Sequence, residues 1–247
     1  MAGHSKWANI KRRKGAQDAK RGKIFTKLIK EITVAAKTGG PDPEGNPRLR
    51  LAIQNAKGVN MPKDNIDRAI SKGSGDDSQN YTETTYEGYA PHGVAVFVET
   101  TTDNLNRTVS SVRSTFSKYG GNLGTNGSLE FIFDRKGVFT VYTPQSTDID
   151  DLTLELIDAG AEEVETADGY MHIICAMEDF GSMQRKLESL QIEAENAELQ
   201  RIPNTLVELD DEALGKVMKL IDTLEDDDDV QKVYHNIDIK EEQLELL

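Results

Sequence analysis

Residues 137–202 read GVFTVYTPQSTDIDDLTLELIDAGAEEVETADGYMHIICAMEDFGSMQRKLESLQIEAENAELQRI. Short runs rich in β-branched and aromatic residues alternate there with segments whose apolar residues recur every three or four positions. The expected strands are residues 137–143, 162–166, 170–176 and 195–202, and the expected helices are residues 148–159 and 178–190. The two middle strands meet at Asp168-Gly169, a pair typical of hairpin turns. This β-α-β-β-α-β order predicts a complete ferredoxin-like unit.

The segments on either side of this unit repeat the pattern in two halves. Strands are expected at residues 93–102 and 128–134 around a helix at 103–119, and a helix at 210–224 precedes a last strand at 230–237. We therefore predict an α+β protein in which one ferredoxin-like domain, residues 137–202, is inserted into another, residues 79–136 and 203–247. A single continuous mixed sheet is the competing architecture.

Residues 1–78 precede the α/β segments and predict a basic three-helix domain. In residues 20–37, apolar side chains occupy one side of a helix and a row of lysines occupies the opposite side. Two shorter helices follow, one beginning at Asn46-Pro47 and the other ending at Gly73. This pair also allows a helix-turn-helix interpretation, as most helical bundles do.

Charge is distributed unevenly along the chain, although its net value is −14. Residues 1–75 contain 17 lysines and arginines against 6 acids, whereas residues 76–247 contain 12 against 37. An acidic body repels polyanions, so we expect a nucleic acid to contact only the basic end. Lysine and arginine bind phosphate without reading sequence, and both DNA and RNA stay open as the target.

The candidate nucleic-acid-binding residues all lie in the first 30 positions. They are Lys6, Trp7, Lys11, Arg12, Arg13, Lys14, Lys20, Arg21, Lys23, Lys27 and Lys30. The basic residues would neutralise phosphates. The tryptophan would either stack on an unpaired base or anchor the segment to the protein.

The sequence offers little support for catalysis, metal binding or membrane insertion. Its four histidines lie in unrelated segments, its single cysteine, Cys175, excludes an internal disulfide, and no nucleophile or zinc-protease motif occurs. The acidic run at residues 225–229 lacks the spacing of a calcium-binding loop, so we expect a solvated turn there. No apolar run reaches the length of a membrane span, and we expect a cytoplasmic, non-enzymatic protein without cofactors.

Several segments resemble the YebC/PmpR family, and the resemblance covers the full length of the chain. They are residues 1–40, MPKDNIDRAISKGSG at 61–75, YEGYAPHGVAVFVETTTDNLNRTVSSVR at 86–113, SKYGGNLG at 117–124 and DVQKVYHNID at 229–238. The family includes probable transcriptional regulators, the mitochondrial translational activator of cytochrome oxidase subunit one, and members linked to ribosomes stalled on proline-rich sequence. The resemblance implies a helical domain and two α/β domains.

Together these features predict a non-enzymatic, nucleic-acid-binding regulator of gene expression. The resemblance implies a DNA-binding transcriptional regulator. Two alternatives stay open: a ribosome-associated translation factor that binds ribosomal RNA and relieves stalling, and a small-molecule-binding regulatory protein. The expected partners are DNA, ribosomal RNA or the ribosome, all through the N-terminal domain, and no membrane. The sequence makes no prediction of the oligomeric state.

Overall fold

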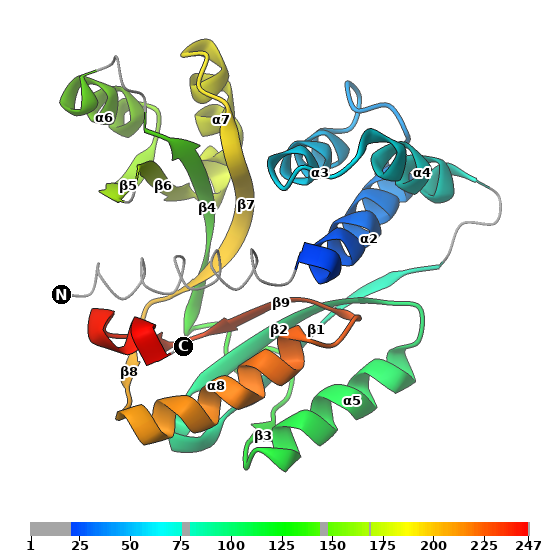
Figure 1. The fold of residues 1–247 in the computed structure, drawn as a ribbon, viewed down its shortest axis with the longest axis vertical. Coiled ribbons are helices and arrows are strands. Elements are labelled where there is room, and N and C mark those ends of the chain that lie inside the picture. The colour runs from blue at the N-terminus through cyan, green and yellow to red at the C-terminus, as the bar shows by residue number, and fades with distance from the viewer. Residues whose placement is uncertain (1–20, 76–79, 144–147, 168, 247) are drawn as a thin grey trace. The chain divides into compact units, whose positions relative to one another are not determined.

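The computed structural model of the protein describes residues 21–75, 80–143, 148–167 and 169–246. These residues form a mixed α/β structure with two four-stranded sheets (Figure 1). The chain divides into two compact units. Of the described residues, the first contains 21–34, 75, 80–134 and 202–246, and the second contains 35–74, 135–143, 148–167 and 169–201. The α+β class predicted from the sequence is confirmed.

The second unit contains the predicted β-α-β-β-α-β module. Its strands are β4 (Phe133–Tyr142), β5 (Ala161–Ala167), β6 (Tyr170–Ala176) and β7 (Ala194–Pro203), and its helices are α6 (Ile149–Asp158) and α7 (Phe180–Ser189). The sheet order is β5-β6-β4-β7, with Thr140 of β4 opposite His172 of antiparallel β6. A short 3-10 helix, Met177–Asp179, joins β6 to α7.

Helices α6 and α7 each bury two or more apolar side chains in the core of this unit. Leu156 of α6 and Met183 of α7 are fully buried in one cluster with Phe139 and Ile173. Cys175 belongs to the same core, where burial raises the pKa of its thiol to about 11. The thiol is therefore a small buried apolar group.

Helix α3 (Pro47–Gly58) covers the edge strand β7 within the same unit. The amide of Asn55 donates to the carbonyl of Ala197 at 3.0 Å and accepts from its N–H at 3.1 Å, as a neighbouring strand would. At Gly58 a Cβ would lie 2.2 Å from the Glu195 carbonyl oxygen, so only glycine permits this close approach. Helix α3 begins where the sequence predicts, because the side chain of Asn46 caps it by accepting from the Leu49 N–H at 3.1 Å.

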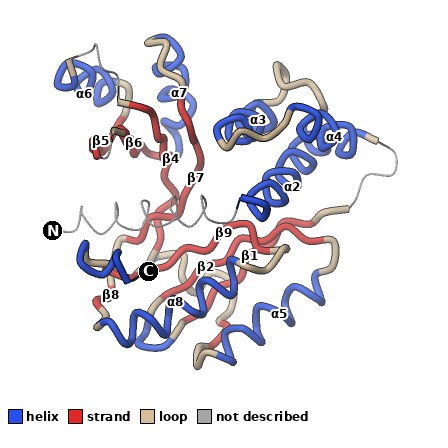
Figure 2. Tube along the Cα trace, viewed as in Figure 1, coloured by secondary structure: helices blue, strands red, loops and turns tan. Residues whose placement is uncertain are grey.

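The first unit contains the second sheet, in the order β3-β1-β2-β9. Its strands are β1 (Thr82–Tyr89), β2 (Ala95–Thr102), β3 (Asn122–Leu123) and β9 (Val230–His235), and its helices are α5 (Leu105–Lys118) and α8 (Asp211–Glu225). Both helices pack on one face of the sheet, whose strands form a twisted layer (Figure 2). Smaller elements are the 3-10 helices Pro91–Gly93 and Glu241–Leu246 and the parallel pair β8 (Val207–Glu208) and β10 (Ile237–Asp238).

Two details of this unit differ from the prediction. Strand β1 was not predicted, and it pairs with β2 along its whole length, so the sheet begins with a hairpin instead of a β-α-β segment. Residues 128–132 are turns, whereas a strand was expected at 128–134. The cause is Glu87, a buried carboxylate that accepts hydrogen bonds from the N–H groups of Gly127 at 2.7 Å and Leu129 at 2.6 Å.

The remaining helices are α2 (Arg21–Gly39), which confirms the helix expected at residues 20–37, and α4 (Lys63–Ser74). Within the described part of the chain, no helix has both the length and the apolar composition needed to cross a bilayer.

Candidate nucleic-acid interface

The structure describes part of the candidate set. Lys6, Trp7, Lys11, Arg12, Arg13, Lys14 and Lys20 lie outside the described residues. Arg21 is the first residue of α2. The side chains of Lys23, Lys27 and Lys30 come from successive turns of α2 and are directed to one place in the first unit.

That place is the acidic turn, defined here as residues 225–229, at the C-terminal end of α8. Lys23 Nζ lies 3.0 Å from a carboxylate oxygen of Asp226 and 3.1 Å from its carbonyl oxygen. Lys27 Nζ donates to the carbonyl of Glu225 at 3.0 Å. Cations are favoured beside the last carbonyls of a helix, because these carry the negative end of its dipole. The lysine row thus neutralises both a helix end and part of an acidic run.

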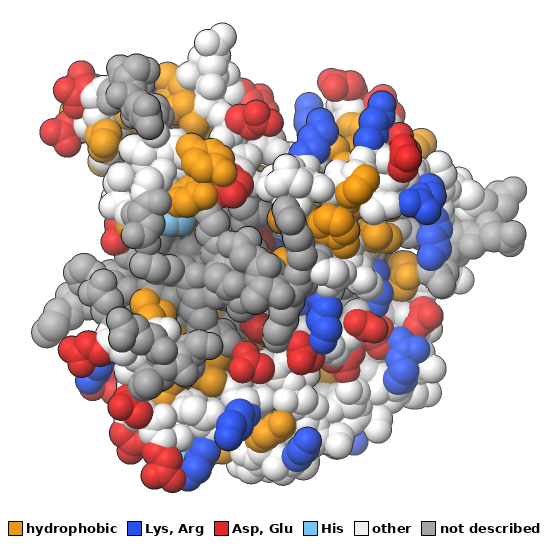
Figure 3. Space-filling view, viewed as in Figure 1, with side chains coloured by type: hydrophobic (Ala, Val, Ile, Leu, Met, Phe, Trp, Pro, Cys, Tyr) orange, Lys and Arg blue, Asp and Glu red, His pale blue; other side chains and the backbone are white. Residues whose placement is uncertain are grey.

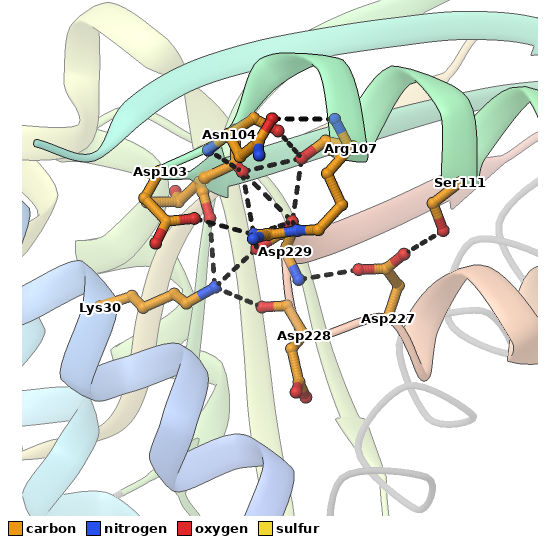
Figure 4. A network of polar contacts seen from close by, with 11 residues as sticks. Lys30, Asp103, Asn104, Arg107, Ser111, Asp227, Asp228 and Asp229 are labelled. Atoms are coloured by element: carbon orange, nitrogen blue, oxygen red, sulfur yellow. Dashed lines mark hydrogen bonds and ion pairs between the residues drawn. The ribbon is translucent and has the colours of Figure 1, made fainter.

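Lys30 reaches further into the same turn (Figure 4). Its Nζ donates to the carbonyl of Asp228 at 2.6 Å and to the carboxylate of Asp229 at 3.2 Å. It also donates to the carbonyl of Thr101 at 3.3 Å and lies 5.6 Å from the centre of the Tyr81 ring. Lys30 therefore joins α2 to strand β2 and to the acidic turn at once.

Asp229 is the centre of a buried polar network. Only 5% of the residue is exposed, and its carboxylate accepts from Arg107 of α5, from Thr108 at 2.9 Å and from Thr102 at 3.2 Å. Burial alone would raise the pKa of Asp229, but hydrogen bonds from Arg107, Thr108 and Lys30 outweigh it, and the pKa is lowered. The carboxylate is therefore ionised at neutral pH.

The rest of the turn is also ordered by specific contacts. Asp227 accepts from the hydroxyl of Ser111 at 2.5 Å and from the N–H of Asp229 at 2.9 Å. The solvated turn expected from the sequence was therefore wrong for Asp227 and Asp229, although Asp226 and Asp228 are exposed. The run of identical residues gave no sequence signal that Asp227 and Asp229 contact Ser111, Arg107 and Thr108.

A second group of cations lies on α3 and α4 in the second unit. Arg50, Lys57, Lys63, Arg68 and Lys72 are exposed. Figure 3 shows lysine and arginine side chains over these two helices. These residues belong to the excess of lysine and arginine over acids in residues 1–75, but they are not among the nucleic-acid-binding residues predicted from the sequence.

The second unit also contains a cavity of about 360 Å³ between α3, α7 and the start of β7. Phe139, Leu187 and Ile192 supply apolar walls, and Gln54, Gln184 and Gln191 supply amides. Among the described residues, no group of three or more His, Cys, Asp or Glu side chains is placed to hold a metal ion.

Comparison with known proteins gives matches along almost the whole chain. Residues 5–76 match the family model described as the TACO1/YebC protein N-terminal domain, and residues 81–237 match that of the TACO1/YebC second and third domain. A relative from Amoebophilus asiaticus is 63% identical over 239 residues, covering 96% of this chain and 98% of its own. One from Geotalea uraniireducens is 54% identical over 246 residues, covering 99% of both. Both are named probable transcriptional regulatory protein.

A solved structure is also similar. The crystal structure of a conserved hypothetical protein from Aquifex aeolicus has a TM-score of 0.81 and 46% sequence identity, covering 91% of this chain and 93% of that one.

Proposed function

Because the chain belongs to the TACO1/YebC family, we propose that it is a non-enzymatic regulator of gene expression that binds nucleic acid through its basic N-terminal segment. The observation that carries the proposal is the concentration of positive charge. Within residues 1–37 there are 11 lysines and arginines and 2 acids, in a protein whose net charge is −14. Such a segment attracts phosphate, while the acidic remainder limits non-specific wrapping.

The contacts of α2 divide the candidate residues into two groups. Lys23, Lys27 and Lys30 already have oxygen partners in the acidic turn, so a phosphate would have to displace those partners. The basic cluster at residues 11–14 precedes α2 and carries four positive charges. We assign the main phosphate contact to this cluster, with Trp7 as the residue that stacks on a base.

Two nucleic-acid targets stay open: duplex DNA, on which a transcriptional regulator would act, and ribosomal RNA within the ribosome. Two features favour ribosomal RNA. The lysine face of α2 is engaged inside the protein, and helix α4, which would serve as a recognition helix, carries both signs of charge: Lys63, Arg68 and Lys72 with Asp64 and Asp67. A protein that reads the major groove needs side chains aimed at base edges. Contact with the phosphates of a large ribonucleoprotein needs only a basic segment.

Co-sedimentation with ribosomes through a sucrose cushion, at near-physiological salt, tests the proposal. The variant Lys11→Glu, Arg12→Glu, Arg13→Glu, Lys14→Glu should stay in the supernatant while the unmodified protein pellets. Random duplex DNA is the competitor. Pelleting that survives the duplex supports the translation factor, and pelleting that the duplex removes supports the DNA-binding regulator.

A matched control separates a local contact from a general charge effect. Arg50→Glu, Lys57→Glu, Lys63→Glu, Lys72→Glu makes the same change in net charge at exposed positions of α3 and α4. If the cluster at residues 11–14 carries the contact, this control keeps most of the binding. Equal losses in both variants would show that binding follows net charge alone. Binding unchanged in the first variant, even at low salt, would refute the proposal.

The cavity in the second unit supports the small-molecule alternative, because its apolar walls and amide groups suit an apolar ligand with hydrogen-bonding groups. Thermal unfolding in the presence of amino acids and nucleotides tests it. A reproducible rise in the melting temperature with one of them, lost when Ala197 of the cavity is changed to Leu, would favour this function.

A further inference from the structure

Helix α6 has a wide apolar surface, and only part of it is buried. Leu152 and Leu156 are buried in the core of the second unit. Ile149, Leu154 and Ile157 are 39%, 60% and 50% exposed. At 100° per residue these three fall in an arc of about 140°, which adjoins the two buried leucines and contains Asp150. They form the exposed part of the apolar surface of α6, which we name the α6 stripe.

The α6 stripe lies among acids. Residues 148–158 contain five acids and no lysine or arginine: Asp148, Asp150, Asp151, Glu155 and Asp158. Figure 3 shows apolar and acidic side chains next to each other over α6.

Local stability accounts for only part of this acidity. Asp148 caps the helix by accepting from the N–H of Asp150 at 3.0 Å, and acids in the first turn are favoured by the helix dipole. Glu155 accepts from Lys186 of α7 at 2.7 Å. Asp158, however, stands in the last turn, where no basic residue accompanies it and a negative charge opposes the dipole. This acid does not stabilise the helix, and the exposed parts of Ile149, Leu154 and Ile157 bury no apolar surface within the unit.

We propose that the α6 stripe is a docking surface for a cationic amphipathic helix of a protein partner. The apolar side of that helix would cover Ile149, Leu154 and Ile157, and its lysines or arginines would lie beside Asp150, Asp151 and Asp158. Charge complementarity selects this partner, because a nucleic acid would be repelled by the same acids and an acidic protein likewise. The regulator would thus bind nucleic acid with its basic segment and a basic protein with α6.

The surface is small, so the complex is expected to be weak and fast to exchange. The probe is a fluorescent 18-residue helical peptide with leucines at heptad a and d positions and lysines flanking them. Fluorescence anisotropy should give a saturable curve with the unmodified full-length protein. The double variant Leu154→Ser, Ile157→Ser should weaken the affinity at least tenfold. Because both side chains are exposed, its circular dichroism spectrum and melting temperature should stay close to those of the unmodified protein.

Leu105→Ser is the matched control. Leu105 is 48% exposed on α5 in the first unit, so its replacement removes an equally exposed aliphatic side chain outside the α6 stripe. The affinity for the peptide should not change. A second variant, Asp150→Asn, Asp151→Asn, Asp158→Asn, should weaken binding several-fold at low salt and little at high salt.

Three results would overturn the proposal. One is the absence of saturable binding to the unmodified protein, and another is equal affinity for a peptide of the same composition with shuffled order. The third is a dimer in sedimentation velocity that the Leu154→Ser, Ile157→Ser variant abolishes, since the α6 stripe would then be covered by a second copy of the chain.

Discussion

The guanidinium of Arg107 binds both oxygens of the Asp229 carboxylate, with Nη2 at 2.8 Å from Oδ1 and 2.6 Å from Oδ2. A third contact, from Nε to Oδ2, measures 3.0 Å. The side chain of Asp229 is 8% exposed and that of Arg107 is 53% exposed, so the aspartate carries most of the desolvation cost. The pair fastens the N-terminal turn of α5 to the residue that precedes β9.

Replacing Asp229 with asparagine should lower the free energy of unfolding by about 2 kcal/mol at pH 7, because Arg107 and Lys30 lose their shared charge partner. The pKa of Asp229 is lowered in the folded protein, so its contribution is complete above the ordinary aspartate pKa, near 4. The contribution declines as the pH falls through the lower, folded value. Urea unfolding at several pH values should therefore show the two proteins converging in acid.

Asp228→Asn is the control for that series. It removes one negative charge from the same turn, but the Asp228 side chain is exposed and Lys30 contacts only its carbonyl. Its stability should stay within about 0.5 kcal/mol of the unmodified protein, as for most surface changes. A loss equal to that of Asp229→Asn would mean that the turn responds to total charge and not to the network.

Replacing Asp226 with asparagine should strengthen nucleic-acid binding a few-fold at low salt. Lys23 loses a carboxylate 3.0 Å from its Nζ and becomes a better phosphate ligand. Anisotropy with a labelled RNA or DNA fragment measures the change. Glu212→Gln is the comparison, since it removes the exposed partner of Lys216, 2.7 Å away, at the opposite end of α8. An equal gain in affinity in both variants would show that binding responds to net charge and not to the release of Lys23.

Replacing Glu87 with alanine should release the turns at residues 125–132. The N–H groups of Gly127 and Leu129 would lose their carboxylate acceptor, with an expected cost of about 1–3 kcal/mol, because the Leu129 donor is buried whereas Gly127 is exposed. Hydrogen exchange at these two amides should accelerate more than at amides in β2. Glu83→Ala, an exposed change on the same strand, should leave both rates unaltered.

Replacing Gly58 with alanine should destabilise the second unit, because the new methyl would lie 2.2 Å from the Glu195 carbonyl oxygen and α3 would have to move. A loss of about 2 kcal/mol in urea unfolding is expected for such overpacking. Gly215→Ala is the matched change, within α8 and with no atom within 4 Å of the added carbon, and it should stabilise by up to about 1 kcal/mol. Stability of Gly58→Ala equal to that of the unmodified protein would contradict the close packing of α3 on β7.

The sequence was informative where a local pattern determines the structure. The inserted module, the amphipathic helix α2 and the start of α3 at Asn46-Pro47 all follow from periodicity and capping. Strand β1 was missed because TETTYEGY is polar; it pairs with the next strand, β2, and with β3, which follows α5. A helical wheel places Lys23, Lys27 and Lys30 opposite the apolar side of α2. It does not reveal that their partners are carbonyls and carboxylates at the end of α8, about 200 positions later.

That separation affects how the protein is made. Lys30 and Asp229 are 199 residues apart, and a ribosome adds about 5–20 residues per second, so the lysines of α2 wait for roughly 10–40 s before the acidic turn is synthesised. During this interval the lysines of α2 lack the carbonyls and carboxylates that they contact in the folded first unit. They gain these partners only after almost the whole chain has been synthesised.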